Sequence, residues 1–465
     1  MNDSDTSLLK KSIFRRKEKL GFKRTQNSFE NPKKLREIDP DLTTYYLRIS
    51  SFTGPFTKMK NSPSLPALNF LSRGKQLCQK LSILNQPEKP LFSLPKPPLD
   101  SKYKFVIFPG NNSEAIKKIM KTRENWEEIP AIEHSSAHFI WQPIAKSLRF
   151  DRLLPYLPKQ MANHFEHHFE ITDKRNLCFN LSQYCEEKGM SIDDMVPKTF
   201  FIEFNSSHVK AQIKSFICYF KSRPKKPASF WIFKPSGLNR GQGISLFTRL
   251  SEFKSILKSV PKNSDTVIVQ KYIENPLLLS NRKFDIRVWV LITHEYKCFF
   301  CKEGYIRTSS EEFSLSRSSI HNKFVHLTNN AVQQKSSSYS KFEDGNQIDL
   351  RSLESVLPTP ETFETIYQQI QDLVVSSLLS VKKKKLNPHK RQYCFEIFGY
   401  DFLIDSDFKP WLIECNTNPC LELSSKLLEN LIPRMLDQAL GLTIDKLFHS
   451  PKSEENTLWK HLTSI

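Results

Sequence analysis

The sequence predicts a mixed α/β (α+β) fold that follows a basic N-terminal arm. A strand and then a helix begin near Tyr103, and short apolar runs broken by turns dominate residues 230–300 and 393–416. Amphipathic helical patterns occupy residues 361–381 and 427–448. Strands interspersed with helices indicate a mixed architecture, and 465 residues are enough for two or three domains.

Residues 1–102 are expected to form a basic, Pro/Ser-rich extension that is mostly disordered, with a short helix at 71–84. Residues 1–100 contain 19 Lys and Arg against 9 Asp and Glu, which is half of the chain's net charge of +20. This excess favours an acidic partner, such as nucleic acid, an anionic membrane or an acidic protein tail. The alternative is a solvated arm that only keeps the protein soluble.

An α/β subdomain is expected over residues 103–202. Residues 105–108 predict a strand and residues 109–112 a turn. Ser113 is predicted to be the N-cap of a helix that places Ile116, Ile119 and Met120 on one face. A helical pattern at 171–188 leads to a strand at 197–202. Further along, the four lysines at 382–385 are interpreted as the solvated end of the preceding helix.

The nine cysteines form no framework. Cys298 and Cys301 are the one close C-x-x-C pair, without the second pair that a zinc site needs. A reduced intracellular protein is therefore expected. No signal-peptide pattern and no apolar run near the roughly 18 residues of a membrane span are present, which predicts a soluble protein.

A loop suited to phosphate follows the apolar run at 230–233. Lys234 ends that predicted strand, and Arg240, Gly241 and Gly243 follow it. Glycines let backbone N–H groups approach phosphate oxygens, and the two basic residues add charge. The segment lacks the Gly-Lys-Ser/Thr ending of a P-loop, and a basic β-hairpin explains it equally well when it is taken alone.

A second segment, residues 267–274, is an apolar strand with a polar end. Gln270 and Lys271 end the strand, and Ile273 follows. Such a strand can bond an adenine edge through its backbone while the isoleucine packs on the ring. An ordinary strand end is the simpler explanation of this segment by itself.

The third segment, residues 282–291, alternates charged and apolar side chains. Strand periodicity places Lys283, Asp285 and Arg287 on one face. Three charges facing one way suit a polar ligand cavity, and an exposed ladder of ion pairs is the competing interpretation.

The fourth segment, residues 395–419, predicts two strands joined by a turn at 406–409. If the turn centres near Asp407, Asp401 lies roughly opposite Glu414, and Asn416 shares the face of Glu414. Two carboxylates and an amide oxygen among apolar residues are costly to bury, and such hard oxygen ligands suit Mg²⁺. A metal site is favoured over a coincidental buried pair.

The order and the residues of these segments resemble the motifs of the tubulin–tyrosine ligase-like family of ATP-grasp enzymes, over roughly residues 103–448. The matching motifs are NHF at 163–165 with Lys174, VPKTF at 196–200, RGQGI at 240–244, QKYI at 270–273, RKFDIR at 282–287, HLTN at 326–329 and the Asp401…Glu414-x-Asn416 hairpin. The resemblance implies an N-terminal subdomain at 103–202, a central ATP-grasp subdomain at 203–290, a C-terminal subdomain with the metal site at 291–448 and a tail at 449–465.

The resemblance also implies a role for each matching residue. Lys174, Lys234, Arg240, Gly241 and Gly243 would contact ATP phosphates, Gln270, Lys271 and Ile273 the adenine, Lys283 and Asp285 the nucleotide, with Thr328 and Asn329 completing the pocket. Arg287 would face the incoming amino acid or the nucleotide, and Arg307 the γ-phosphate or acyl phosphate. Asp401, Glu414 and Asn416 would hold Mg²⁺.

The activity that the resemblance implies is an ATP- and Mg²⁺-dependent ligase. It would join a free glutamate, tyrosine or glycine to the acidic tail of tubulin or microtubules through an acyl phosphate. A cytoplasmic, cytoskeletal or ciliary monomer that binds neither nucleic acid nor membrane is expected. The alternatives are a catalytically inactive microtubule-binding protein and a ligase for another acidic protein.

Overall fold

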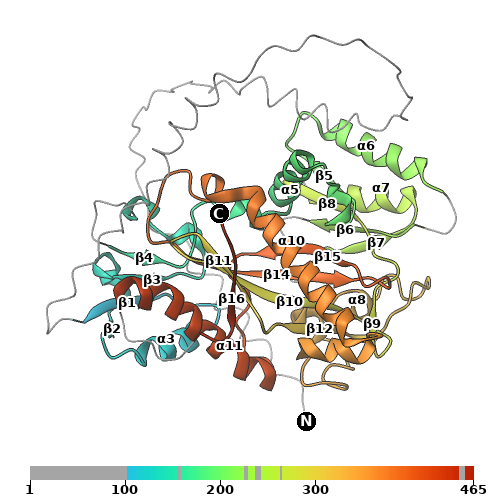
Figure 1. Ribbon diagram of the computed structural model, residues 1–465. Coiled ribbons are helices and arrows are strands. Elements are labelled where there is room, and N and C mark those ends of the chain that lie inside the picture. The colour runs from blue at the N-terminus through green and yellow to red at the C-terminus, as the bar shows by residue number, and fades with distance from the viewer. Residues whose placement is uncertain (1–101, 154–158, 225–228, 236–241, 262–263, 450–455) are drawn as a thin grey trace, which may run out of the picture. The chain divides into compact units, whose positions relative to one another are not determined.

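The structure is a computed structural model that describes residues 102–465 except 154–158, 225–228, 236–241, 262–263 and 450–455 (Figure 1). The predicted disordered arm and the predicted helix at 71–84 lie outside the described residues. Within the described part the fold is mixed α/β with three sheets, which confirms the predicted fold class.

The first sheet is parallel and has the strand order β2-β1-β3-β4. Its strands are β1 (Tyr103–Ile107), β2 (Trp126–Glu128), β3 (Phe139–Trp141) and β4 (Met161–Ala162). Helix α3 (Ser113–Lys121) follows β1 and buries Ile116, Ile119 and Met120, as predicted. The N-cap prediction was wrong by one residue: Asn112, in a left-handed conformation, is the cap, and Ser113 is already helical.

The second sheet is antiparallel, with the order β5-β8-β6-β7. Its strands are β5 (Thr199–Glu203), β6 (Trp231–Pro235), β7 (Ser245–Phe247) and β8 (Thr266–Lys271). Helices α6 (Val209–Ser222) and α7 (Leu250–Ser259) contribute Phe216 and Phe253 to a core with Trp231 and Phe247. The sheet therefore has its own apolar core.

The third sheet is built around the long strand β10 (Arg282–Ile292), which pairs with β9, β11, β12 and β14. The other strands are β9 (Leu278–Leu279), β11 (Lys297–Cys301), β12 (Tyr305–Glu312), β13 (Gln347–Asp349), β14 (Glu396–Ile404), β15 (Pro410–Asn416) and β16 (Trp459–Ser464). All of these pairings are antiparallel. Residues 459–464, in the segment expected to be a tail, form the strand β16 beside β11.

Helices cover both faces of this sheet. Val288, Val290 and Ile292 pack in one core with α10 (Pro360–Leu386), whereas Trp289 and Leu291 pack in a second core with α11 (Lys426–Leu440) (Figure 1). Because both faces are covered, β10 is apolar on both sides towards its end. The chain also contains α4 (Phe169–Thr172), α5 (Lys174–Lys188), α8 (Lys323–His326), α9 (Asn330–Gln333) and α12 (Lys446–Phe448).

Short helical turns connect these elements. They are the 3₁₀ turns η1 (Ala131–Ser136), η2 (Ala145–Ser147), η3 (Phe150–Arg152), η4 (Ile192–Asp194) and η5 (Leu350–Val356), and the π-helical turn η6 (Gly441–Asp445). The predicted helices at 361–381 and 427–448 are confirmed as α10 and as α11 continued by η6 and α12. Helix α10 is interrupted at Lys382 (φ 49°).

The structure also tests the expectations for the lysines at 382–385 and for the Cys298/Cys301 pair. Lys385 is anchored rather than solvated, because its Nζ donates to Asn180 Oδ1 at 2.7 Å on α5. Cys298 and Cys301 pack into the two different cores, so they do not form a shared metal site. Within the described ranges, no helix has the length and apolar character of a membrane span.

Candidate active site

The cationic end of the site lies where α5 meets the second sheet. Lys234, on β6, donates from Nζ to Gln270 Oε1 on β8 at 2.8 Å, and Gln270 donates in turn to Thr199 Oγ1 at 2.9 Å. Burial and the nearby charge of Lys174 lower the pKa of Lys234 to about 8. The predicted residues Lys174, Lys234 and Gln270 line one cavity of about 10 Å³, which is room for about one water molecule.

The strand end predicted to meet adenine is held by Lys271. Its Nζ donates to the backbone carbonyls of Phe230 and Tyr272, each at 3.2 Å, and also contacts Glu274. Burial lowers the pKa of Lys271 in spite of the attraction of Glu274. Ile273 follows, partly exposed. Gln270 and Lys271 have separate sets of partners in the structure, and contact of this strand end with adenine stays a prediction.

The charged face of β10 points into the protein. Lys283 and Arg287 are 5% and 4% exposed, so the interpretation as an exposed ion-pair ladder is wrong. Lys283 donates to the Tyr272 hydroxyl at 2.9 Å and to the His326 carbonyl at 3.2 Å. Burial, aided by the charge of Lys234, lowers the pKa of Lys283 to about 7.

Two buried arginines meet Asp401 of β14. Arg287 Nε lies 2.5 Å from Asp401 Oδ1, and Arg307 Nη2 lies 2.8 Å from Asp401 Oδ2. Arg307 also donates from Nε to Asp285 Oδ1 at 2.9 Å. Gly399 makes room for this cluster, because a Cβ there would lie 3.2 Å from Arg287 Nη1 and 2.8 Å from the Pro419 side chain.

The predicted metal residues meet on the β14–β15 hairpin. Asp401 and Glu414 are paired in register, close to the predicted arrangement, although a shift of register between Asp401 and Phe402 is needed to pair them. Asn416 Nδ2 donates to Glu414 Oε1 at 3.0 Å. Lys174 Nζ lies 2.5 Å from Glu414 Oε2. Burial works to raise the pKa of Glu414, but Lys174 overcomes it and holds that pKa well below the ordinary value. Burial raises the pKa of Asp401.

This donor set fits Mg²⁺. It offers two carboxylates on adjacent strands and one side-chain amide, and the amide of Asn416 presents either its oxygen or its nitrogen by rotation about the last side-chain bond. Protein cations neutralise both carboxylates, so a metal ion bound here would replace Lys174 at Glu414.

The remaining predicted residues lie around this centre or outside the described residues. Thr328 is buried, and its carbonyl accepts from Asn346 at 2.9 Å; Asn329 is the N-cap residue of α9. Gly243 has a φ of 69°, a conformation that favours glycine in the turn before β7. Arg240 and Gly241 fall in 236–241, outside the described residues.

Sequence reasoning assigned no role to two buried acids that hold the site's surroundings. Glu396, at the start of β14, accepts from the backbone N–H of Phe165 and contacts His164 Nδ1 at 3.0 Å. Glu343 makes a bidentate pair with Arg282 at 2.8 and 2.7 Å. The NHF motif gave a signal for the first pair, but no local pattern points to Glu343.

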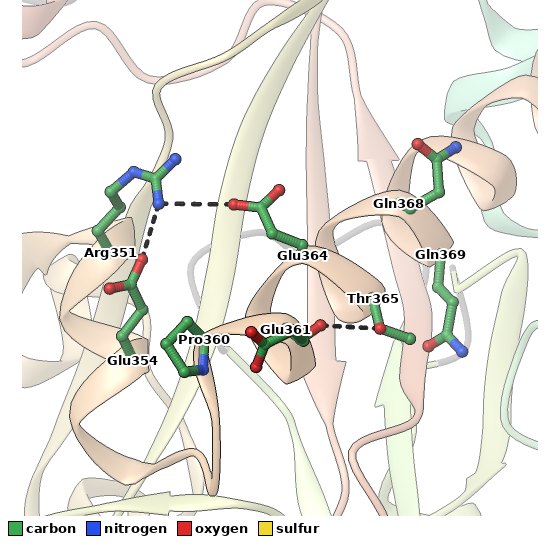
Figure 2. Close-up of a pocket in the computed structure, with 8 residues that line it drawn as sticks. All are labelled: Arg351, Glu354, Pro360, Glu361, Glu364, Thr365, Gln368 and Gln369. Atoms are coloured by element: carbon green, nitrogen blue, oxygen red, sulfur yellow. Dashed lines mark hydrogen bonds and ion pairs between the residues drawn. The ribbon is translucent and has the colours of Figure 1, made fainter.

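An open depression elsewhere contains none of the predicted site residues. It has a volume of about 740 Å³ and lies along η5 and the first turns of α10 (Figure 2). Arg351 reaches Glu354 at 2.7 Å and Glu364 at 3.6 Å there. These are exposed surface ion pairs without a converging set of chemical groups, so the candidate site stays at β10, β14 and β15.

Comparison with known proteins agrees with the geometry. Residues 153–455 match the model of the Tubulin-tyrosine ligase family, which is more than half of the chain. The chain belongs to this family. The match confirms the resemblance, and within it lie every predicted site residue and the second sheet; the first sheet lies largely before residue 153.

Several known proteins are similar to the chain. Tubulin glycylase 3D of Tetrahymena thermophila is 36% identical over 223 residues, 47% of this chain but only 21% of the glycylase. Probable alpha-tubulin polyglutamylase Ttll1 of the same organism is 30% identical over 311 residues, 61% of this chain and 72% of that protein. Probable tubulin polyglutamylase TTLL9 of Bos taurus is 29% identical over 367 residues, 69% and 76% of the two chains.

Proposed function

We propose that the chain is an ATP- and Mg²⁺-dependent ligase with an ATP-grasp fold that joins an amino acid to a carboxylate of a tubulin tail. The observation that carries this proposal is a group of basic and acidic side chains that lie near one another. Half-buried Lys234 lies near Lys174 and Glu414, and Glu414 is paired with Asp401. Buried Lys283 lies near Lys234 and Asp285. Phosphoryl transfer to a carboxylate needs such a combination, because negative charge spreads over the transferred group.

In the proposed reaction, an oxygen of the acceptor carboxylate attacks the γ-phosphorus of ATP, and ADP leaves. The amine of the free amino acid then attacks the acyl carbon of the acyl phosphate. An amide bond forms, the bond between the acyl carbon and the phosphate oxygen breaks, and inorganic phosphate leaves. The amine loses a proton in this step. No nucleophile of the protein enters this sequence.

The protein's own residues position and neutralise the reacting groups. Lys174, Lys234 and Lys283 are proposed to hold the phosphates, and Arg307 to face the transferred group. Mg²⁺ held by Asp401, Glu414 and Asn416 would supply further positive charge to the phosphate oxygens. Arg287 is already fixed by Asp401, which orients its guanidinium for a substrate carboxylate or for the nucleotide.

Tubulin is the proposed acceptor because all the relatives named above carry tubulin in their names. Those names are glycylase and polyglutamylase, which favours glycine or glutamate over tyrosine as the added amino acid. Action on the cytoskeleton follows from that acceptor. The three-subdomain division at 203, 291 and 449 stays part of this proposal.

The test is incorporation of radiolabelled Glu, Gly and Tyr into microtubules with Mg·ATP. Glu414→Gln removes the charge of a metal ligand with little change in volume, and we expect it to lower turnover by about 10²–10³-fold or more. Glu354→Gln, in an exposed ion pair with Arg351 that includes none of the predicted site residues, is the matched control and should retain full turnover.

Label from one amino acid, lost in Glu414→Gln and kept in Glu354→Gln, would support both the reaction and the site. Normal turnover by Glu414→Gln would overturn the metal assignment. Absence of label from all three amino acids would favour the inactive microtubule-binding protein or a different acidic acceptor, and a microtubule co-sedimentation assay separates these two.

A further inference from the structure

A second group of metal-ligand residues lies outside the proposed active site. Glu166, His167 and His389 each offer one ligand atom, and these three atoms lie within 4.8 Å of one another. Glu166 and His167 follow β4, whereas His389 lies in the connection from α10 to β14. Residues more than 200 positions apart therefore converge at one place.

The backbone fixes the meeting of these two segments. Ala162 bridges Cys394 in parallel, and two backbone hydrogen bonds of 3.0 Å join Ala162 to Tyr393 and Phe395. The cluster begins four residues beyond this bridge on one side and five residues before it on the other. The β bridge between Ala162 and Cys394 therefore holds the two segments of the cluster close together.

The two imidazoles are arranged around the carboxylate. His389 Nδ1 lies 3.1 Å from Glu166 Oε2, and the rings of His167 and His389 meet edge to face with centroids 5.1 Å apart. Among residues 102–465 as far as they are described, no hydrogen bond to a ring nitrogen of His167 is recorded, so its lone pair is available to a ligand. Imidazole nitrogen together with carboxylate oxygen is a ligand set typical of zinc.

Arg391 has a positive charge that opposes a cation here. It donates from Nε to Glu166 Oε2 at 2.7 Å, and Nη2 lies 3.4 Å from Oε1. Burial works to raise the pKa of Glu166, but Arg391 and His389 outweigh it, so that pKa is lowered and the acid is ionised at neutral pH. A metal-binding carboxylate commonly accepts a hydrogen bond from a neighbouring group, and Arg391 can orient Glu166 in that way.

We propose that Glu166, His167 and His389 bind a divalent transition-metal ion of the zinc class, with water in the fourth position. The ion would link the segment after β4, which carries His164 and leads to Lys174, to the segment that enters β14. Its role is to brace the two sides of the active site from outside. The proposal rests on these three side chains and does not depend on ligase activity.

The test is titration of the intact chain, carrying Glu414→Gln to silence the carboxylate site, with Co²⁺ and then with Zn²⁺ as competitor. We expect one Co²⁺ with the strong visible absorption of a four-coordinate site with nitrogen ligands, displaced by Zn²⁺, and a higher melting temperature with either ion. His167→Ala and His389→Ala should each weaken binding by about ten-fold or more, because even loss of an orienting partner costs that much.

His208→Ala is the matched control, since His208 is an exposed histidine at the start of α6. It should bind Co²⁺ as the parent does. Equal affinity in all the variants, or only the weak absorption of six oxygen ligands, would overturn the proposal and leave a plain ion pair between His389 and Glu166. Circular dichroism is the check that each variant is folded. In a folded variant, a loss of Co²⁺ binding is assigned to the substituted side chain.

Discussion

The two ends of the site differ in the partners of their charged side chains. The cationic end contains Lys234 and Lys283, and the carboxylate end contains Asp401 and Glu414. At the cationic end, Lys234 and Lys283 donate to neutral groups, an amide and a phenol, and burial lowers their pKa values to about 8 and about 7. At the carboxylate end, Asp401 and Glu414 are held by Arg287, Arg307 and Lys174.

The difference shows what each end lacks without substrates. Among the residues that the structure describes, no carboxylate is hydrogen-bonded to either lysine, so an anionic phosphate would favour their charged forms. The two acids already have protein cations, so a metal ion bound as proposed would displace Lys174 from Glu414. Under the proposed function, phosphate binding at one end and metal binding at the other would be coupled through Lys174, which lies near both Glu414 and Lys234.

The largest expected effect comes from breaking the carboxylate end with Asp401→Asn. This change leaves Arg287 buried without its counter-charge and Arg307 with Asp285 alone, so the free energy of unfolding should fall by about 3–5 kcal/mol. Urea denaturation measures it. Asp151→Asn, in the exposed pair with Arg149, is the control and should cause no measurable change. A similarly small change for Asp401→Asn would mean that the cost of burying the acid cancels its two ion pairs.

The next effect concerns pH and sharpens the account of the cationic end. The pKa values of Lys234 and Lys283 lie below the ordinary lysine value in the free protein, and bound phosphate should raise them. As the pH rises, the two lysines lose their protons in the free protein but keep them in the complex. The Kd for an ATP analogue should therefore rise from pH 7.5 to 9, by up to about ten-fold per pH unit for each lysine.

Isothermal titration calorimetry in buffers of different ionisation heat measures both the Kd and the protons taken up. Lys283→Met should flatten the pH dependence, leaving the part due to Lys234. A Kd that does not change over this range in the unmodified protein would refute the lowered pKa values of the lysines.

The smallest expected effect tests the neutral partner of Lys283. Tyr272→Phe removes the hydroxyl that lies 2.9 Å from Lys283 Nζ and 3.0 Å from His326 Nδ1. We expect a loss of about 1–2 kcal/mol in the free energy of unfolding, with a several-fold weaker affinity for the ATP analogue. Tyr367→Phe, which removes a hydroxyl bonded to the Lys302 carbonyl far from the site, should leave that affinity unchanged. Equal affinities for the two variants would mean that Tyr272 does not position Lys283.

Local patterns predicted the parts of the site that follow from strand geometry. Side chains alternate with a period of two, so the predicted turn at 406–409 brought Asp401 roughly opposite Glu414. The register next to the turn pairs Phe402 with Leu412, and a shift of register beside Asp401, which the turn does not predict, completes its pairing with Glu414. The same period placed Lys283, Asp285 and Arg287 on one face. The start of α5 was missed, although Asp173 is a typical N-cap residue and its side chain accepts from the N–H groups of Arg175 and Asn176.

Other features have no local signal. Strand β16 has polar, exposed residues such as Lys460 and His461, which resemble those of a tail until the strand pairs with β11 at the sheet edge. The partners of the buried charges are equally remote: Lys174 lies 240 positions before Glu414, and Glu343 lies 61 positions after Arg282.

The sequence by itself determined the mixed α/β class, the β14–β15 hairpin and the kinds of side chain that could bind phosphate and metal, because periodicity and turn positions depend only on neighbouring residues. The tertiary structure decided which cation neutralises which acid and which lysines are left with neutral partners. Those pairings depend on contacts between distant segments and on burial, and only the folded chain brings these segments together and excludes water from them.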